Sequence, residues 1–163
     1  MLYLVFQLGA DRYALEVSQI IELLPLVDIR RIPQAPAGMA GVFDCRGTPV
    51  PVIDLSELIL GTPARRRLST RVIVVRYDDH RGNARALGLI AEQATDTLRR
   101  APADFVDPGI GSRDAAYLGP VTRDGRGLVQ RIEVSQLLSA AVRDALFNTT
   151  VDQEWPSPAS PAS

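Results

Sequence analysis

The sequence VIDLSELI at residues 52–59 returns as RIEVSQLL at residues 131–138, 79 positions later. A second pair of similar segments precedes these two, because residues 14–24 match residues 88–98 at a separation of 74 positions. Internal duplication sets the architecture of a chain, and two copies favour a pair of small subdomains over a solenoid. We therefore interpret the chain as two similar halves.

The length and composition are typical of a folded soluble protein. Of 163 residues, 46% are hydrophobic and 23% are charged, which is the usual balance for a globular domain. Each half alone would be marginally stable, so we expect the halves to share one core. No apolar run approaches the roughly 20 residues that span a bilayer. Residues 2–6 follow Met1 without a basic region, which indicates a strand and not a signal peptide.

Charge and cysteine content narrow the location and the partners. The single cysteine, Cys45, excludes an internal disulfide and suits a reducing compartment, so we expect the protein in the cytoplasm. The formal net charge of −1 gives no overall field that would attract nucleic acid. All eighteen basic residues are arginines, which excludes a lysine Schiff base and a P-loop phosphate clamp. We expect the arginine run at residues 65–67 to be a solvated loop.

Apolar patterns and turn residues predict short strands for most of the chain. The runs at residues 1–8 and 12–15 flank a turn at residues 9–11, as in a hairpin. A single helical turn and then a strand are expected over residues 16–24, before Pro25. The prolines of loop 33–38 exclude a regular helix there. Further strands are predicted over residues 50–53, 71–77 and 86–91, and the prolines at 49 and 51 indicate an edge or a bulge.

Short helices are predicted after two of these strands. Asp54 and Glu57 have the spacing of a capping box for a helix over residues 55–60, closed by Gly61. By the repeat, Glu133 is expected to cap a second helix in the same way. Apolar residues over 134–147 predict an amphipathic C-terminal helix, and residues 148–163 have too little apolar content to fold.

The search for catalytic chemistry is largely negative. His80, the only histidine, lies in a polar turn without metal-ligand partners at a recognised spacing, so we interpret it as a solvated turn residue. Cys45 has no base nearby in the sequence and is interpreted as a buried thiol. Nucleotide-binding, serine-hydrolase and metalloprotease motifs do not occur. We therefore predict no catalytic residue, no metal and no cofactor.

Several motifs, in order, resemble the CheW-like chemotaxis coupling domain. The resemblance covers about residues 2–140, and its first half is highly specific. The segments that carry it are RYAL at 12–15, IIEL at 20–23, IPQAP at 32–36, GVFDCRG at 41–47, VPVIDL at 50–55, ALGLI at 86–90, TDTL at 95–98 and residues 117–138.

The resemblance implies a mainly β fold. That fold has two five-stranded SH3-like β-barrel subdomains that share a hydrophobic core, with short helices and a C-terminal helix. It implies a domain over residues 1–147, with a first subdomain at about 9–68, a second at about 69–147, and exchange of terminal strands between them. Residues 148–163 are then a disordered tail.

The same resemblance implies a non-enzymatic signalling adaptor. Its partners would be the cytoplasmic tip of a methyl-accepting chemoreceptor and the regulatory domain of a CheA-like histidine kinase. The location would be the cytoplasm, at membrane receptor arrays, without direct membrane insertion or nucleic-acid binding.

The family signature Asn-Leu-Arg-Gly corresponds here to Asp44, Cys45, Arg46 and Gly47, so that its first two positions depart. The resemblance suggests Arg46 and Gly47 as receptor-binding residues, and the planar guanidinium suits a groove that holds carbonyls or a carboxylate. Alternatively, these two residues only shape a tight turn. Asp44 either pairs with Arg46 or selects a different receptor.

Other site residues follow from the resemblance alone. Thr97 and Leu98 match the receptor-binding region of the second half. Ile20, Glu22 and Gly41 match kinase-binding positions, although Ile20 and Leu98 suit a core equally well. The second half departs further from the family at residues 130, 131 and 133, and we expect its outer face to be specialised.

A narrower resemblance concerns the signalling output. Residues 1–8, 24–27, 58–67, 92–95 and 117–121 are similar to the CheW-like adaptor of Wsp-type surface-sensing systems, in which the output is cyclic-di-GMP and biofilm formation. The alternatives are an adaptor for flagellar motility and a small β-barrel that binds another ligand. The acidic-aromatic segment DQEW at residues 152–155 is either a docking peptide or a functionless end.

Overall fold

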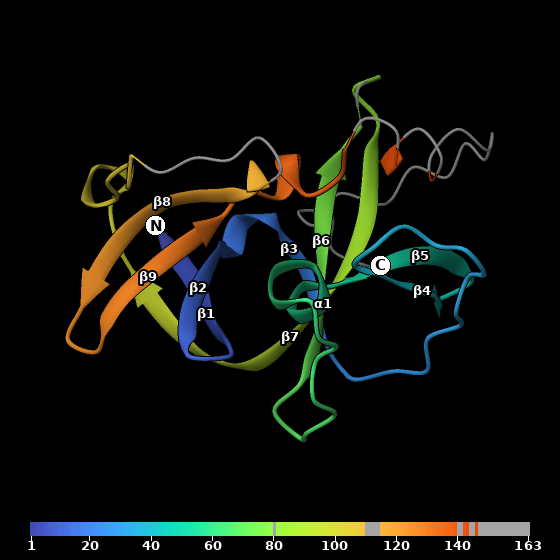
Figure 1. The fold of residues 1–163 in the computed structure, drawn as a ribbon. Helices are drawn as coiled ribbons and strands as arrows, with labels where there is room; N and C mark the ends of the chain where they lie inside the picture. The colour runs from blue at the N-terminus through green and yellow to red at the C-terminus, as the bar shows by residue number, and fades with distance from the viewer. Residues whose placement is uncertain (80, 110–114, 140–141, 144–145, 147–163) are drawn as a thin grey trace.

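The computed structural model describes residues 1–79, 81–109, 115–139, 142–143 and 146. Strands dominate this part of the chain, which confirms the expected mainly β fold (Figure 1). The elements, in order, are β1 (Leu2–Leu8), β2 (Asp11–Glu16), η1 (Val17–Gln19), β3 (Ile20–Pro25), β4 (Met39–Cys45), β5 (Thr48–Asp54), α1 (Leu55–Leu60), β6 (Arg71–Asp78), β7 (Ala84–Arg99), η2 (Pro102–Asp104), β8 (Leu118–Asp124), β9 (Gly127–Ile132) and η4 (Val134–Gln136).

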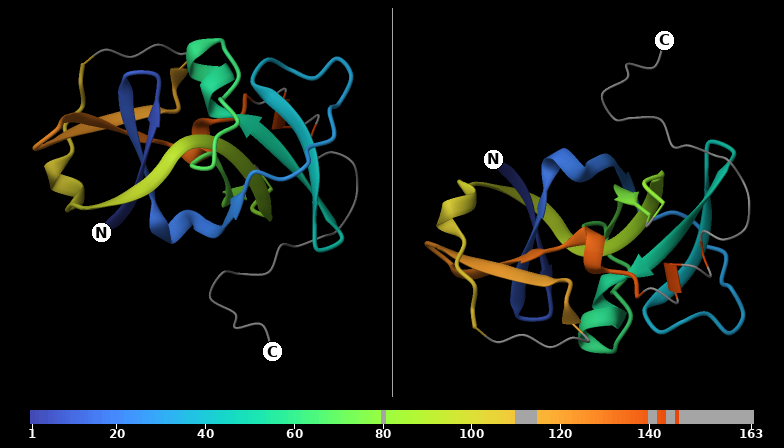
Figure 2. Two further views of the ribbon diagram at one scale, coloured as in Figure 1. Left: turned by 90° about the horizontal axis from the view of Figure 1, so that it is seen from below. Right: turned by 90° about the horizontal axis from the view of Figure 1, so that it is seen from above.

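The 16-residue strand β7 belongs to two sheets of five strands each. Its first half pairs with β6 and β5, and its second half pairs with β1. Between the halves, Gln93 has a positive φ of 49°, where the register with β1 also shifts. One sheet holds β1, β2, β7, β8 and β9, and the other holds β3, β4, β5, β6 and β7. The β8–β9 and β4–β5 hairpins lie at opposite ends of the molecule (Figure 1 and Figure 2).

The two parallel strand pairs reproduce the sequence repeat. Ala14 in β2 lies opposite Arg131 in β9, and Gly88 in β7 lies opposite Val52 in β5. In the repeat, Ala14 corresponds to Gly88 and Val52 to Arg131. Each sheet therefore takes strands from both sides of residue 68, and the division of the chain there remains an interpretation of the sequence.

Strand alternation divides the apolar residues among three buried clusters. In β6, Ile73 and Val75 belong to a core shared by both sheets. Val72 and Val74 belong to a second cluster, inside the sheet formed by β3, β4, β5, β6 and β7. This period of two is what a strand buried on both faces requires. A third cluster, of Tyr3, Ala14, Phe105 and Val129, packs inside the sheet that holds β1, β2, β8 and β9.

The predicted helix after β5 is correct, but its counterpart in the second half is not. The Asp54 carboxylate accepts hydrogen bonds from the backbone N–H groups of Ser56 (3.0 Å) and Glu57 (3.2 Å), and Gly61 ends α1 with a φ of 80°. The repeat-equivalent element is a single 3-10 turn, η4, whose N-cap Glu133 makes no capping bond. Glu133 instead pairs with Arg131 at 2.7 Å, so the prediction of a second cap was wrong.

Other expectations meet the structure only in part. The prolines of β5 were expected to place that strand at an edge or a bulge. They lie where β5 pairs with β4 alone, as at an edge, whereas residues 52–54 also pair with β7. The C-terminal helix expected over residues 134–147 does not begin at residue 134, because residues 134–136 form the 3-10 turn η4 and residues 137–139 are not helical. Residues 142, 143 and 146 are helical, while residues 140, 141, 144, 145 and 147, the tail over residues 148–163 and His80 lie outside the described residues. Within the described ranges, no helix combines the length and apolar composition that crossing a membrane requires.

A partly buried ion pair ties β2 to the end of β8. The Arg12 guanidinium donates two hydrogen bonds of 2.7 Å to the two carboxylate oxygens of Asp124. Both side chains are largely buried, with 13% and 15% of their surface exposed. This contact lowers the pKa of Asp124 from 3.8 to about 2.

We predict that Asp124→Asn removes acid-sensitive stability. Because the folded-state pKa is depressed, the contribution is complete above about pH 5 and is lost as the pH falls toward 2. After allowance for partial solvent screening, we expect a loss of about 1–2 kcal/mol in unfolding free energy at pH 6. Urea unfolding from pH 6 to pH 2.5 should show this difference from the wild type narrowing. The exposed Asp78→Asn serves as control, and a constant difference for Asp124→Asn would contradict the assignment.

Candidate functional site

The first candidate site lies where the edge strands β3 and β4 approach each other, a line that we call the seam. These strands are the two ends of the order β3-β6-β7-β5-β4, so closing the sheet into a barrel brings them together. Arg30, beyond the end of β3, exchanges two backbone hydrogen bonds with Val42 of β4, at 2.8 and 2.9 Å. Gly41 makes this approach possible, because a Cβ atom there would lie 2.1 Å from the Arg30 carbonyl oxygen.

The β4–β5 hairpin presents Arg46 at one end of the seam. Arg46 and Gly47 form a two-residue turn between the paired residues Cys45 and Thr48. Both have positive φ, 54° and 86°, as a type I′ turn requires. A non-glycine residue in this region costs roughly 1–2 kcal/mol, so the arginine is held at some cost in backbone energy.

Asp44 supports the turn and does not pair with Arg46. Its carboxylate accepts a 2.7 Å hydrogen bond from the Gly47 backbone N–H. The expected Asp44–Arg46 pair is therefore not formed. Arg46 and Gly47 do shape a tight turn, and the turn also determines where the guanidinium lies.

The Arg46 guanidinium crosses the seam to Glu22 of β3, at 2.8 Å. Its side chain is 76% exposed, whereas that of Glu22 is 24% exposed. An exposed pair of this kind contributes no more than about 1 kcal/mol to stability. The ion pair therefore contributes little to holding the barrel closed.

The thiol beneath the turn is buried. Cys45 is buried in the cluster inside this sheet. Burial raises the pKa of its thiol, and the negative charge of Glu22 raises it further, so the protonated form prevails at neutral pH. Within the described ranges, no group of three metal-ligating side chains is present.

The predicted site residues divide between the two sheets. The seam brings together Glu22, Gly41, Arg46 and Gly47, whereas Ile20, in the same sheet, packs against the shared core. Thr97 and Leu98 lie in the second half of β7, within the other sheet, opposite Leu4 and Tyr3 of β1. Thr97 is exposed, and Leu98 packs on the third cluster.

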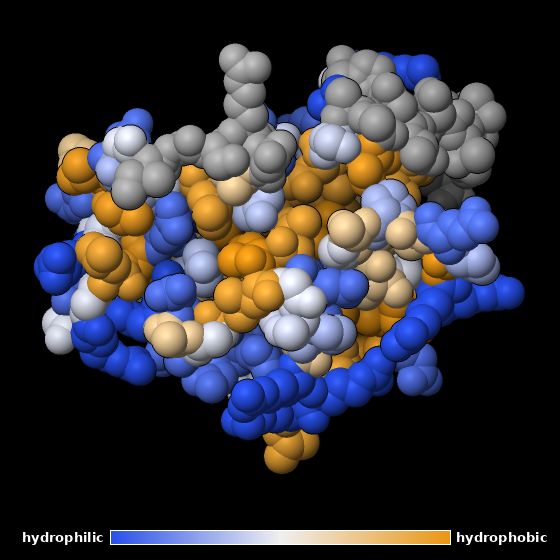
Figure 3. Space-filling model, viewed as in Figure 1, coloured by the Kyte–Doolittle hydropathy of each residue, from blue (hydrophilic) through white to orange (hydrophobic). Residues whose placement is uncertain are grey.

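Sequence reasoning missed two cavities, and none of the seven predicted residues lines either of them. The first, of about 270 Å³, has Arg31 and Arg66 at its mouth, and we call it the arginine cavity. The second, of about 290 Å³, is lined by Ile53 and Leu58 from one half and by Tyr117 and Leu137 from the other. We call it the inter-sheet cavity. Figure 3 shows hydrophobic surface gathered between the two halves on this face. The apolar residues that line the inter-sheet cavity have the sequence pattern of ordinary core residues, so no sign of the cavity was visible in the sequence.

Comparisons with known proteins agree on one family. A family model described as a CheW-like domain matches residues 2–142. The chemotaxis protein CheW of Treponema pallidum is 25% identical over 152 residues, which cover 88% of this chain and 85% of that protein. Protein FrzA of Myxococcus xanthus is 28% identical over 148 residues, with 88% and 89% covered.

A solved structure shares the fold. It is that of the scaffolding protein TtCheW from Thermoanaerobacter tengcongensis, with a TM-score of 0.75 and 22% identity. The match covers 86% of this chain and 89% of that one.

We predict that Gly41 is needed for the close approach of the two strands at the seam. Gly41→Ala would force a Cβ atom against the Arg30 carbonyl and should lower the unfolding free energy by about 3 kcal/mol or more. Gly47→Ala is the matched control, because it also has positive φ but meets no atom within 4 Å, and should cost about 1 kcal/mol. Urea unfolding of both variants checks this. Equal costs would show that the close approach at Gly41 is unimportant.

Proposed function

The chain belongs to the CheW-like domain family, and from this premise we propose that it is a non-enzymatic adaptor that couples a methyl-accepting chemoreceptor to a CheA-like histidine kinase. The receptor would contribute its cytoplasmic tip and the kinase its regulatory domain. The adaptor would work in the cytoplasm, at receptor arrays in the membrane. The chemotaxis protein CheW of Treponema pallidum, matched over most of its length, supports a role in this class of signalling.

One observation carries the proposal, the Glu22–Arg46 ion pair. It joins a residue proposed to bind the kinase to one proposed to bind the receptor. A receptor carboxylate that binds the exposed guanidinium would compete with Glu22 for the same donors. Binding of the receptor at Arg46 would then leave the Glu22 carboxylate unpaired and change the charge of the kinase-binding surface. The barrel would stay closed, because its buried core holds it together.

The remaining proposed residues have different tasks. Gly47 fixes the turn that carries Arg46, and Gly41 sets the spacing of the seam. Thr97 is exposed on the other sheet, where it would extend the receptor-binding surface, and Leu98 would position it. Ile20 would place β3 relative to the kinase. Because each contact is modest, an array would gain strength from many such contacts.

The function is tested by a pull-down with the purified protein from detergent-solubilised native membranes and cytoplasm. We expect the wild type to recover a chemoreceptor and a histidine kinase. Arg46→Ala should recover at least about tenfold less receptor, because a charge-assisted contact is lost, while its thermal midpoint stays within a few degrees of the wild type. Arg76→Ala, which removes another exposed, ion-paired arginine of the same sheet, is the control.

Two results would contradict the proposal. Recovery of neither a receptor nor a kinase by the wild type would refute the adaptor function. Equal receptor recovery by Arg46→Ala and the wild type would refute the role of Arg46 alone.

For the output, we propose a Wsp-type pathway that controls cyclic-di-GMP and biofilm formation, with chemotaxis by flagellar motility as the alternative. The support is the narrower sequence resemblance. Deletion of the gene in its native host should lower surface-induced cyclic-di-GMP and biofilm mass, both restored by the wild-type gene. A deletion that abolishes chemotactic swimming and leaves cyclic-di-GMP unchanged would favour the alternative.

A further inference from the structure

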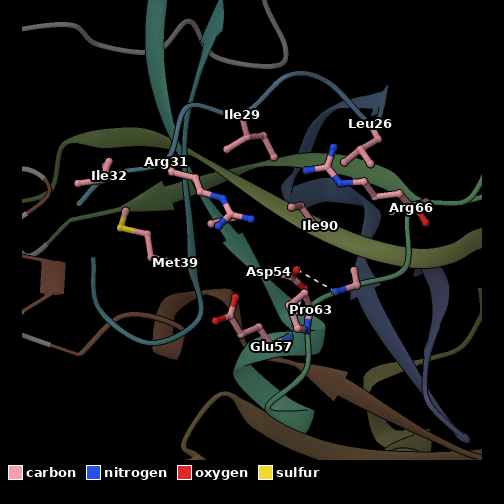
Figure 4. A pocket seen from close by; sticks show the side chains of 13 residues that line it. Leu26, Ile29, Arg31, Ile32, Met39, Asp54, Glu57, Pro63, Arg66 and Ile90 are labelled. Atoms are coloured by element: carbon pink, nitrogen blue, oxygen red, sulfur yellow. Dashed lines mark hydrogen bonds between the residues drawn. The ribbon is translucent and has the colours of Figure 1, made fainter. Parts of the chain in front are cut away.

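The arginine cavity opens between two loops, residues 26–38 and residues 61–70. Arg31 from the first loop and Arg66 from the second extend toward one another across its mouth (Figure 4). Apolar side chains also line it, including Leu26, Ile29 and Ile90. At about 270 Å³ it falls just below the range of roughly 300 Å³ and above that holds drug-sized molecules. Its size suits one bulky side chain with its neighbours.

The cations at the mouth are not neutralised within the described part of the chain. Neither Arg31 nor Arg66 forms an ion pair or a side-chain hydrogen bond with a described residue. Nearby carboxylates are occupied by backbone donors. Asp54 accepts from the N–H groups of residues 56, 57 and 64, and Glu92 accepts from the N–H of residue 65 at 2.8 Å. Glu57 also faces the cavity (Figure 4), so that two guanidinium groups face one available carboxylate.

The loop that carries Arg66 is held in place. Its backbone N–H groups donate to Asp54 and Glu92. In addition, the Thr70 hydroxyl donates to the Arg65 carbonyl and accepts from the Arg67 N–H at 3.2 Å. Leu68, in the same loop, is 96% exposed. The loop projects at the lower edge of the molecule, where hydrophilic surface surrounds an apolar tip (Figure 3). A preformed basic and apolar surface needs little reordering when a ligand binds.

We propose that the arginine cavity docks an acidic peptide with an aromatic anchor, and that the chain's own segment DQEW, residues 152–155, is that ligand. The carboxylates of Asp152 and Glu154 match the two guanidinium groups, which bind carboxylates in a planar, bidentate manner. The indole of Trp155 suits the apolar lining and also stacks favourably on guanidinium planes. This inference goes beyond the adaptor function and does not depend on it.

The position of the described chain supports this choice of ligand. Leu146 lines the inter-sheet cavity, and Met39 lines both that cavity and the arginine cavity. Six positions separate Leu146 from Asp152, which allows a reach of about 20 Å for extended chain. The acidic-aromatic segment therefore begins within reach of a neighbouring basic and apolar site.

Trp155 is the only tryptophan, so its fluorescence reports directly on this segment in the full-length protein. We expect blue-shifted emission and an acrylamide quenching constant at least about threefold below that of the free peptide TTVDQEWPS, because burial of the ring excludes the quencher. Arg31→Glu/Arg66→Glu and Asp152→Asn/Glu154→Gln should each raise quenching to the peptide value. Arg99→Glu/Arg123→Glu, with the same charge change on the other sheet, should leave it unchanged.

The measurement can overturn the proposal in two ways. Wild-type quenching equal to that of the free peptide would show that the segment does not dock. Protection that persists in Arg31→Glu/Arg66→Glu would show that Trp155 is buried elsewhere. Circular dichroism confirms folding, and Arg66→Gln replaces the double variant if that variant fails to fold. If protection of Trp155 from quenching increases with protein concentration, the segment docks on a second copy of the chain. If protection does not depend on concentration, the segment docks on its own chain.

Discussion

The fold depends on a single strand that two sheets share. β7 provides hydrogen bonds to β5 and β6 over its first half and to β1 over its second. It can do so only by bending, and Gln93 supplies the bend with a positive φ. Because residues of both sheets enter one core, neither sheet can open without exposing apolar surface of the other. The two barrels are therefore expected to behave as one rigid body, which is what a scaffold requires.

The duplication was visible in the pattern of residues, whereas an exchange of strands between its copies was expected from the family resemblance alone. Spacing and alternation are local information, and they predicted the β1–β2 hairpin, the single turn before β3 and the bounds of α1. Ala14 pairs with Arg131 and Gly88 with Val52, so each copy completes the other. Pairing within a copy would satisfy the same pattern of buried and exposed residues. Hydrophobic periodicity cannot distinguish two partner strands that are equivalent, and only the three-dimensional closure decides between them.

The candidate site shows the same limit. Family resemblance proposed Glu22, Gly41 and Arg46 one by one, but their meeting at the seam results from barrel closure between strands at opposite ends of a sheet. The sequence neighbour Asp44 was a reasonable partner for Arg46 by distance along the chain. This pair is not formed, because the Asp44 carboxylate accepts from the Gly47 N–H and the Arg46 guanidinium donates to Glu22. In the second half, Glu133 is drawn to Arg131 and so does not repeat the cap that Asp54 makes.

The arginines differ in what surrounds them. Arg12 and Arg131 meet carboxylates beside strands and help to fix the arrangement of the second sheet. Around the arginine cavity, backbone N–H groups occupy Asp54 and Glu92, because a helix start and a tight loop need acceptors there. Arg31 and Arg66 of that region consequently form no ion pair with a described residue. A chain with almost no net charge thus acquires a local basic site, which neither its composition nor its isoelectric point indicates.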